Sequence, residues 1–160
     1  MSIVLARVDE RLVHGRVIND WIAEIKPSLL VIADDALVND EFMSKIYRAL
    51  LPIWLKVEIL SCDKAAKYIK TGSLEKDRIF ILTKTPQAFA VLVRGGINIP
   101  EITLADKAYL KNKLEVSEDN KRAVNWLISA GVMLYATNSP SDSKEPIQSY
   151  RLERINGSWL

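Results

Sequence analysis

The residues best suited to chemistry cluster near the amino terminus, around His14, the only histidine of the chain. Arg7, Asp9, Glu10 and Arg11 precede it within seven positions. A neutral imidazole is a good nucleophile near neutral pH, because its ordinary pKa is about 6.5. Guanidinium groups offer paired N–H donors that match phosphoryl oxygens. These residue types at this spacing indicate a histidine that accepts a phosphoryl group and releases it again.

The place of His14, just before an expected helix, favours the same chemistry. Free backbone N–H groups and the helix dipole attract an anion there, and Gly15 leaves room for a tetrahedral group beside the backbone. Asp9 could orient the ring or hold Arg11 in position. The residues alone also allow an ordinary solvated turn with weak ion pairs, in which His14 is a surface or structural side chain.

Other residues could contribute to this site or form another one. Thr83 and Lys84 follow a later apolar run and could contact a phosphoryl group, although threonine near a proline is also common at a helix start. Cys62, the single cysteine, has no basic neighbour in the sequence and is expected to be inert. One histidine and one cysteine do not make a typical zinc site. Because the chain also lacks a glycine-rich nucleotide loop and a serine elbow, we expect neither a metal nor a cofactor.

Short apolar runs alternate with helical patterns about every 25 residues. This alternation predicts an α/β fold, a three-layer α/β/α sandwich with a mostly parallel sheet of about six or seven strands. Right-handed crossovers place all strand-to-helix loops on one edge, so Arg7, Asp34, Ser61, Thr83 and Ala105 should share one rim. The expected strands are 3–6, 29–33, 56–61, 79–82, 102–105 and 132–136, and the expected helices are 17–25, 41–50, 63–70, 86–94 and 117–130.

The expected helix 41–50 has a clear apolar stripe. Asn39 and Asp40 are typical of a helix start, and Pro52 ends the helix. Its apolar residues recur at helical spacing, so we predict that this stripe is the inner face of the helix. The residues of the stripe are Phe42, Ile46, Ala49 and Leu50.

Length and composition are those of one globular domain over residues 1–160, with 49% hydrophobic and 26% charged residues. The formal net charge of +2 gives no reason to expect nucleic acid as a partner. No apolar run approaches the roughly 20 residues that span a bilayer, and the amino terminus does not resemble a signal peptide. With no internal disulfide available, a cytoplasmic protein is expected.

The run ARVDERLVHG, residues 6–15, resembles the signature of IIB components of the bacterial sugar phosphotransferase system, in the mannose/fructose/sorbose family. The similarity continues through ADDA at 33–36, TKTP at 83–86 and LVRGGI at 92–97. It covers residues 1–103 well and the remainder loosely. The resemblance also implies a three-layer α/β/α sandwich.

The resemblance further implies a function, that of a protein-histidine phosphotransferase. The histidine matching His14 takes a phosphoryl group from a phosphohistidine of a IIA protein or domain. It then passes the group to a sugar carried by the membrane IIC and IID components. The arginines matching Arg7 and Arg11 line the phosphoryl pocket, with Asp9 beside them. Such a protein is cytoplasmic and joins the membrane transporter when active, and a homodimer is left open.

Two features depart from the family pattern. Arg16 stands where the family usually has glutamine and adds a third cation near His14, and the turn at 104–107, LADK, lacks the usual glycines. Gly15, Arg16, Thr83 and Lys84 complete the expected phosphoryl-binding set. Two alternatives keep the fold: a regulator whose partner binding depends on phosphorylation of His14, and a non-catalytic binding module with a decayed site.

Overall fold

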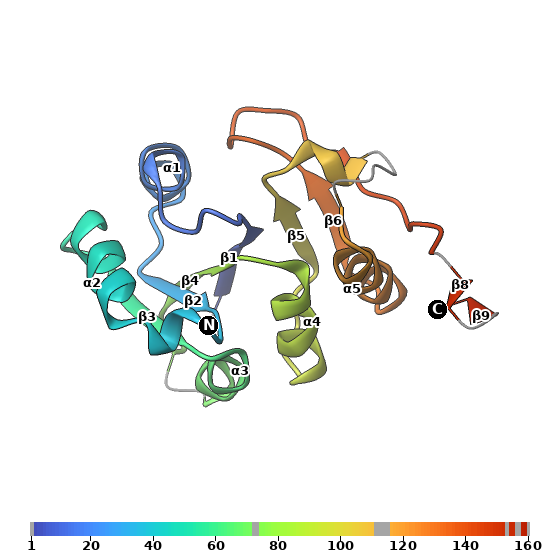
Figure 1. Cartoon of the computed structure of the whole chain (residues 1–160). Helices are drawn as coiled ribbons and strands as arrows, with labels where there is room; N and C mark the ends of the chain where they lie inside the picture. The colour runs from blue at the N-terminus through green and yellow to red at the C-terminus, as the bar shows by residue number, and fades with distance from the viewer. Residues whose placement is uncertain (1, 72–73, 111–115, 153, 156–157, 160) are drawn as a thin grey trace.

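The computed structural model describes residues 2–71, 74–110, 116–152, 154–155 and 158–159. Within them, seven strands form one sheet in the order β3-β2-β4-β1-β5-β6-β7 (Figure 1). Strands β1 to β6 are parallel, and β7 pairs antiparallel with β6. A separate two-stranded ribbon joins β8 to β9. The bounds are β1 (Ser2–Val8), β2 (Leu29–Ala33), β3 (Lys56–Leu60), β4 (Arg78–Thr83), β5 (Glu101–Leu104), β6 (Met133–Ala136), β7 (Glu145–Pro146), β8 (Arg154–Ile155) and β9 (Ser158–Trp159).

Helices cover both faces of the sheet, which confirms the expected α/β architecture with a mostly parallel sheet (Figure 1). Helices α3, α4 and α5 pack on one face, whereas η1, α1 and α2 pack on the other. None of the helices within the described residues is long and apolar enough to cross a membrane. The bounds are η1, a π-helix (Val17–Ile22), α1 (Ala23–Ile25), η2 (Leu37–Asn39), α2 (Glu41–Leu50), α3 (Cys62–Lys70), α4 (Pro86–Arg94), η3 (Lys107–Leu110) and α5 (Glu118–Ser129).

The central strands are buried on both faces, which explains their continuous apolar sequences. In β2, Leu29, Val31 and Ala33 belong to the cluster beneath α3 and α4. The alternate residues Leu30 and Ile32 belong to the cluster beneath η1 and α2. Successive side chains of a strand point to opposite faces, so one apolar run serves both cores.

The strand ends share one edge, as expected. Val8 pairs with Thr83 and with Leu104, and Ala33 pairs with Leu60, so the loops after β1 to β5 leave the sheet at the same level. Arg7 differs from the expectation, because β1 continues to Val8 and Arg7 lies inside the strand. The charge at this position suggested a loop, whereas the fold supplies buried partners for it.

The prediction that the apolar stripe of α2 faces the core is wrong. The exposed fraction is 73% for Phe42 and 53% for Leu50, and none of the helix residues is buried. Met43 and Tyr47, which lie on the adjacent face, pack against the apolar cluster instead. The reason is tertiary: α2 lies beside the edge strand β3 and packs through the side that carries Met43 and Tyr47, which leaves Phe42 and Leu50 exposed.

Candidate functional site

The loop after β1 turns sharply and brings the candidate residues together. The backbone N–H of Asp9 donates to the carbonyl of Thr83 at 2.9 Å, and the N–H of Leu12 donates to the carbonyl of Asp9 at 2.9 Å. Leu12 is buried and has a left-handed backbone with a φ of 54°. Such a conformation costs a non-glycine residue about 1–3 kcal/mol and is concentrated at functional sites.

Asp9 is the centre of this loop. One carboxylate oxygen lies 2.6 Å from Nε2 of His14. The other accepts the backbone N–H of Arg11 at 3.0 Å and its Nε–H at 3.3 Å. Burial raises the pKa of Asp9, but the hydrogen bonds from His14 and Arg11 outweigh this effect, and the pKa lies below its ordinary value. Asp9 is therefore an ionised acceptor at neutral pH, and it both orients the ring and holds Arg11.

The bond to Asp9 determines which nitrogen of His14 is free. An ionised carboxylate has no proton to donate, so Nε2 carries a hydrogen, and in the neutral ring Nδ1 then holds the lone pair. The backbone N–H of Arg16 lies 3.3 Å from Nδ1. The carbonyl of His14 accepts the N–H of Ile18 at 3.1 Å, so His14 stands at the beginning of the helical run 15–25. Nδ1 thus lies at a helix start and accepts the N–H of Arg16, and an anion is favoured at such a position.

Arg7 lies near the end of β1, two residues before Asp9, and is fully buried. Its guanidinium donates to Oγ1 of Thr103 at 3.2 Å and to the carbonyl of Thr137 at 2.9 Å. It also stacks 4.2 Å from the ring centre of Trp21, whose Nε1–H donates to the carbonyl of Asn138 at 3.3 Å. Burial lowers the pKa of Arg7 to about 10, so the side chain stays charged at neutral pH. Arg7 links the first helix to the loop after β6.

Arg11, Gly15 and Arg16 surround His14 on its open side. The side chain of Arg11 is 58% exposed, and Gly15 and Arg16 are exposed as well. The side chain of His14 is 17% exposed. A Cβ atom added at Gly15 would meet only Nδ2 of Asn19, at 3.8 Å. The space beside Gly15 is therefore open to a ligand group.

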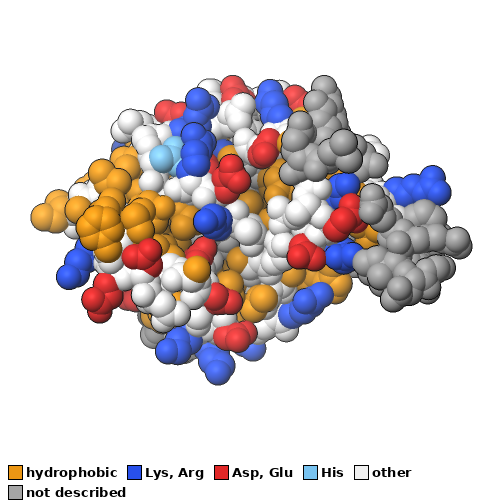
Figure 2. Space-filling view, viewed as in Figure 1, with side chains coloured by type: hydrophobic (Ala, Val, Ile, Leu, Met, Phe, Trp, Pro, Cys, Tyr) orange, Lys and Arg blue, Asp and Glu red, His pale blue; other side chains and the backbone are white. Residues whose placement is uncertain are grey.

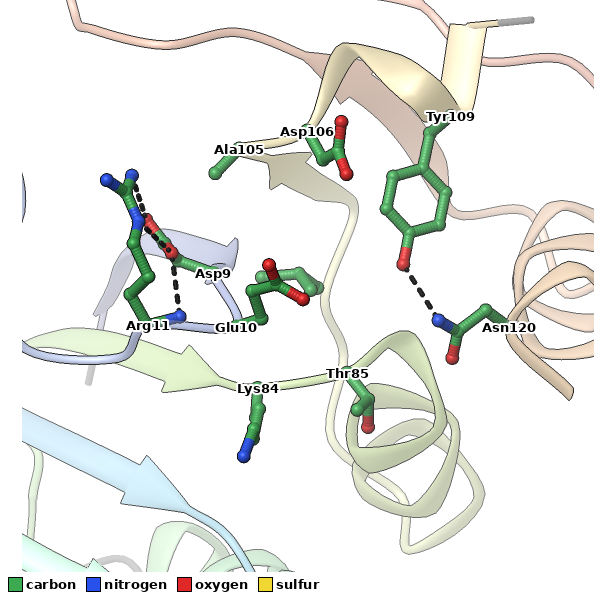
Figure 3. A pocket seen from close by; sticks show the side chains of 10 residues that line it. Asp9, Glu10, Arg11, Lys84, Thr85, Ala105, Asp106, Tyr109 and Asn120 are labelled. Carbon is green, nitrogen blue, oxygen red and sulfur yellow. Dashed lines mark hydrogen bonds and ion pairs between the residues drawn. The ribbon is translucent and has the colours of Figure 1, made fainter. Parts of the chain in front are cut away.

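Thr83 and Lys84 are placed differently. The hydroxyl of Thr83 is buried and donates to the carbonyl of Thr85 at 3.0 Å. The contribution of Thr83 to the site is its backbone carbonyl, which accepts the N–H of Asp9. Figure 3 shows the amine of Lys84 pointing away from Asp9 and Arg11. Among the described residues, neither side chain has a hydrogen bond or ion pair with His14.

A polar pocket of about 300 Å³ lies on the β5 side of the loop (Figure 3). Carboxylates of Glu10 and Asp106 border it, and the hydroxyl of Tyr109 accepts a hydrogen bond from Nδ2 of Asn120 at 3.1 Å. His14 does not line this pocket. Asp9, Arg11 and Lys84 also line it, so the pocket has charges of both signs and adjoins the loop that carries His14.

Sequence reasoning missed several contributors. The carbonyls of Thr137 and Asn138 hold Arg7 and Trp21 in place, and a backbone carbonyl has no sequence signature. Trp21 had only the signal of an apolar helix position. The hydroxyl of Tyr47 donates to the carbonyl of Arg11 at 3.5 Å and so connects α2 to the loop.

Two other kinds of site, a reactive cysteine and a metal centre, find little support. Burial, with Asp35 nearby, raises the pKa of Cys62 to about 12, so the thiol is protonated at neutral pH and is a poor nucleophile. Within the described part of the chain, no three His, Cys, Asp or Glu side chains are grouped so that they could hold a metal ion. His14 is therefore the nucleophile that the arrangement favours.

Comparison with known proteins gives matches over almost the whole chain. The family model for the PTS system sorbose subfamily IIB component matches residues 3–156. The N-acetylgalactosamine-specific phosphotransferase enzyme IIB component 1 of Escherichia coli is 28% identical over 153 residues, which cover 91% of this chain and 96% of that protein. The mannose-specific EIIAB component of Escherichia coli is 24% identical over 150 residues, which cover 90% of this chain and 46% of that protein.

A solved structure is also similar. The IIBSor domain of the sorbose permease from Klebsiella pneumoniae has a TM-score of 0.80 and 27% identity, with 90% of this chain and 92% of that chain covered. The shared fold extends to the mostly parallel sheet described above. With a family model that matches from the first strand to residue 156, the chain belongs to the sorbose subfamily of IIB components, which places it in sugar phosphotransfer.

Proposed function

We propose that His14 carries a phosphoryl group on Nδ1, between a phosphohistidine of a IIA protein and a sugar that enters through membrane IIC and IID components. The observation that carries this proposal is the 2.6 Å bond between Nε2 of His14 and the buried carboxylate of Asp9. That bond leaves the lone pair on Nδ1. The mannose relative supports a IIA donor, since its name joins A and B components in one protein.

In the first step, the lone pair of Nδ1 attacks the phosphorus of the donor phosphohistidine. A bond forms between Nδ1 and phosphorus, and the bond between phosphorus and the donor nitrogen breaks. The donor ring keeps the electron pair of that bond. His14 retains its proton on Nε2, so the phosphorylated ring carries a positive charge, which the carboxylate of Asp9 at 2.6 Å offsets.

The phosphoryl oxygens gain negative charge as they move between nitrogens, and the surrounding groups match that charge. The exposed guanidinium groups of Arg11 and Arg16 can reach solvent-facing oxygens. The N–H of Arg16, which lies 3.3 Å from Nδ1, can donate to an oxygen of the bound group. Arg7 contributes its buried positive charge, and its hydrogen bonds to the carbonyls of Thr137 and Asn138 position the loop after β6.

In the second step, a sugar hydroxyl attacks the phosphorus and the bond to Nδ1 breaks. The electron pair returns to Nδ1, which restores the neutral ring. The hydroxyl proton leaves to solvent or to a group of the membrane component. Catalysis in both steps rests on positioning and charge stabilisation rather than on a separate acid or base of this chain.

The test is phosphorylation of the purified protein. Wild type is incubated with phosphoenolpyruvate, the general phosphocarriers and a cognate IIA protein. We expect one added phosphate that is labile in acid, stable in alkali and absent from His14→Ala, with the ³¹P resonance of an Nδ1-phosphohistidine. A wild-type protein that stays unmodified beside a competent donor would overturn the proposal. Membrane vesicles containing IIC and IID then separate transport from a regulatory role, since only the former yields a sugar phosphate.

A further inference from the structure

Trp21 has the largest side chain of the π-helix η1, and it is buried, with an exposed fraction of 5%. η1 begins three residues after His14, so one helical run carries both the proposed nucleophile and this indole. The segment is unusual, because π-helical turns are rare and are frequently found at functional sites. The contacts of the indole connect it to the charged groups of the site.

The indole makes two directed contacts, one through its face and one through its edge. Its ring centre lies 4.2 Å from the guanidinium carbon of Arg7. Its Nε1–H donates to the carbonyl of Asn138 at 3.3 Å, and the guanidinium of Arg7 donates to the same carbonyl at 3.4 Å. β1, η1 and the loop after β6 therefore meet at one carbonyl oxygen, so a shift of any one of them disturbs the other two.

Hydrogen bonds alone do not complete the surroundings of Arg7. Its terminal nitrogens donate to the hydroxyl of Thr103 and to the carbonyls of Thr137 and Asn138. Its Nε is buried and has no hydrogen-bond partner in the part of the chain that the structure describes. A buried cation without a full set of acceptors is costly, and a tryptophan face is the best aromatic partner for it. The indole supplies this stabilisation and fixes the plane of the guanidinium.

The place of Arg7 matters because positive charge is crowded around His14. Burial lowers the pKa of Arg7 most, the carboxylate of Asp9 raises it, and the nearby charges of Arg16 and Arg11 lower it further. Figure 2 shows basic side chains beside the single histidine. The three guanidinium groups outnumber the one carboxylate, and a phosphoryl group neutralises the excess. The charge of Arg7 is the least screened, because Arg7 is buried and the other two are exposed.

We propose that Trp21 is a positioning residue for phosphoryl transfer: its indole holds the guanidinium of Arg7, and with it the loop after β6, in the arrangement that receives the phosphoryl group. This inference rests on the proposed function. Within the described residues, no hydrogen bond joins Trp21 to His14, so Trp21 acts through Arg7. A charge that is fixed in advance stabilises the transition state without reorganisation.

The experiment compares two substitutions of the indole. Trp21→Leu removes both contacts, whereas Trp21→Phe keeps a ring face over Arg7 and loses only the Nε1–H. Phosphorylation is measured with a cognate IIA protein and with phosphoramidate, a small donor that needs no protein surface. Because a desolvated cation–π contact and a hydrogen bond are both lost, we expect the rate in Trp21→Leu to fall about 10-fold with either donor. Trp21→Phe should show a smaller loss.

Two controls separate positioning from a general loss of stability. Ile22→Ala removes a side chain of the same π-helix that is 1% exposed and packs in the apolar core. Trp126→Leu removes an indole of α5 that stacks 4.3 Å from the guanidinium carbon of Arg94 on α4. Under conditions in which urea titration shows each variant to be folded, both controls should react at the wild-type rate. An equal fall in Ile22→Ala would make the effect of Trp21 purely structural and overturn the inference.

A double-mutant cycle shows whether Trp21 acts through Arg7. In the background of Arg7→Met the indole has no cation to hold, so the further change Trp21→Leu should alter the rate by less than about twofold. If Trp21→Leu does not fold, the cycle is made with Trp21→Phe. Effects that multiply in full, or a wild-type rate in Trp21→Leu, would overturn only the role given to Trp21. Wild type that reacts with neither donor would overturn the proposed function itself.

Discussion

The substitution Asp9→Asn tests the assignment of Nδ1 most directly. Asparagine has the size of aspartate, and its amide oxygen can still accept the N–H of Arg11. Its NH₂ group then faces Nε2 of His14, which must become an acceptor. The ring proton moves to Nδ1, and the nucleophilic lone pair moves to the nitrogen that faces the protein interior. We expect a folded protein whose histidine is in the wrong tautomer.

The magnitude follows from the burial of this pair. A hydrogen bond to a charged group contributes about 1.5–3 kcal/mol. Water cannot replace the bond here, because the side chain of Asp9 is 2% exposed and the two atoms are 2.6 Å apart. To react through Nδ1, the ring of the variant must give up its new bond, and the phosphorylated ring lacks the carboxylate that offsets its charge. At about 1.4 kcal/mol per factor of ten, the rate of phosphorylation should fall about 10- to 100-fold.

Two measurements are needed, tautomer and rate. Because His14 is the only histidine, ¹⁵N-labelled protein gives one unambiguous pair of ring nitrogen signals. Wild type should show a protonated Nε2, and Asp9→Asn should show a protonated Nδ1. The rate of phosphorylation by a cognate IIA protein is then measured under single-turnover conditions.

The matched control is Asp34→Asn, at the end of β2 on the same edge of the sheet. Asp34 accepts the backbone N–H groups of Ala36 and Leu37 and has no bond to His14. It should keep the wild-type tautomer and rate. A normal rate in Asp9→Asn, with Nδ1 protonated, would refute the role given to that nitrogen. A normal rate with the tautomer unchanged would refute the role given to Asp9.

Three further predictions concern the support of the site. Arg7→Lys should lower the free energy of unfolding by about 2 kcal/mol, since an amine cannot span the same buried acceptors or stack on Trp21; an unchanged urea midpoint would contradict this. Gly15→Ala should be as stable as wild type or up to about 1 kcal/mol more stable. It should nevertheless be phosphorylated more slowly, because the added methyl group fills the open space beside His14; a wild-type rate of phosphorylation would show that this space is not used. The pKa of Asp9 is lowered in the folded state, so its contribution to stability is present above its unfolded value of about 4 and is lost as the pH falls through its folded pKa. The difference in unfolding free energy between wild type and Asp9→Asn should therefore be constant near pH 7 and shrink in acid, and a difference that persists to about pH 2 would exclude this linkage.

Local patterns in the sequence were enough to predict the sheet and to bring the candidate site residues into one loop. Apolar runs such as 29–33 and 79–82 predicted strands buried on both faces, because hydrophobic burial depends on the composition of each short segment. The alternation of strands and helices then predicted that the carboxyl ends of the strands lie at one edge of the sheet. His14, Asp9 and Arg11 lie within six positions, so one turn of chain is sufficient to bring them together.

The tertiary structure decided what depends on residues distant in the sequence. The charge of Arg7 predicts a loop residue. Arg7 is nevertheless buried, because the carbonyl of Thr137, 130 positions away in the sequence, accepts its hydrogen bond. The apolar stripe on α2 predicts a face that packs on the core. Phe42 and Leu50 of this stripe are exposed, because α2 lies beside an edge strand and packs through Met43 and Tyr47 instead. A helical period shows that a helix has an apolar face, and only its neighbours determine what covers that face.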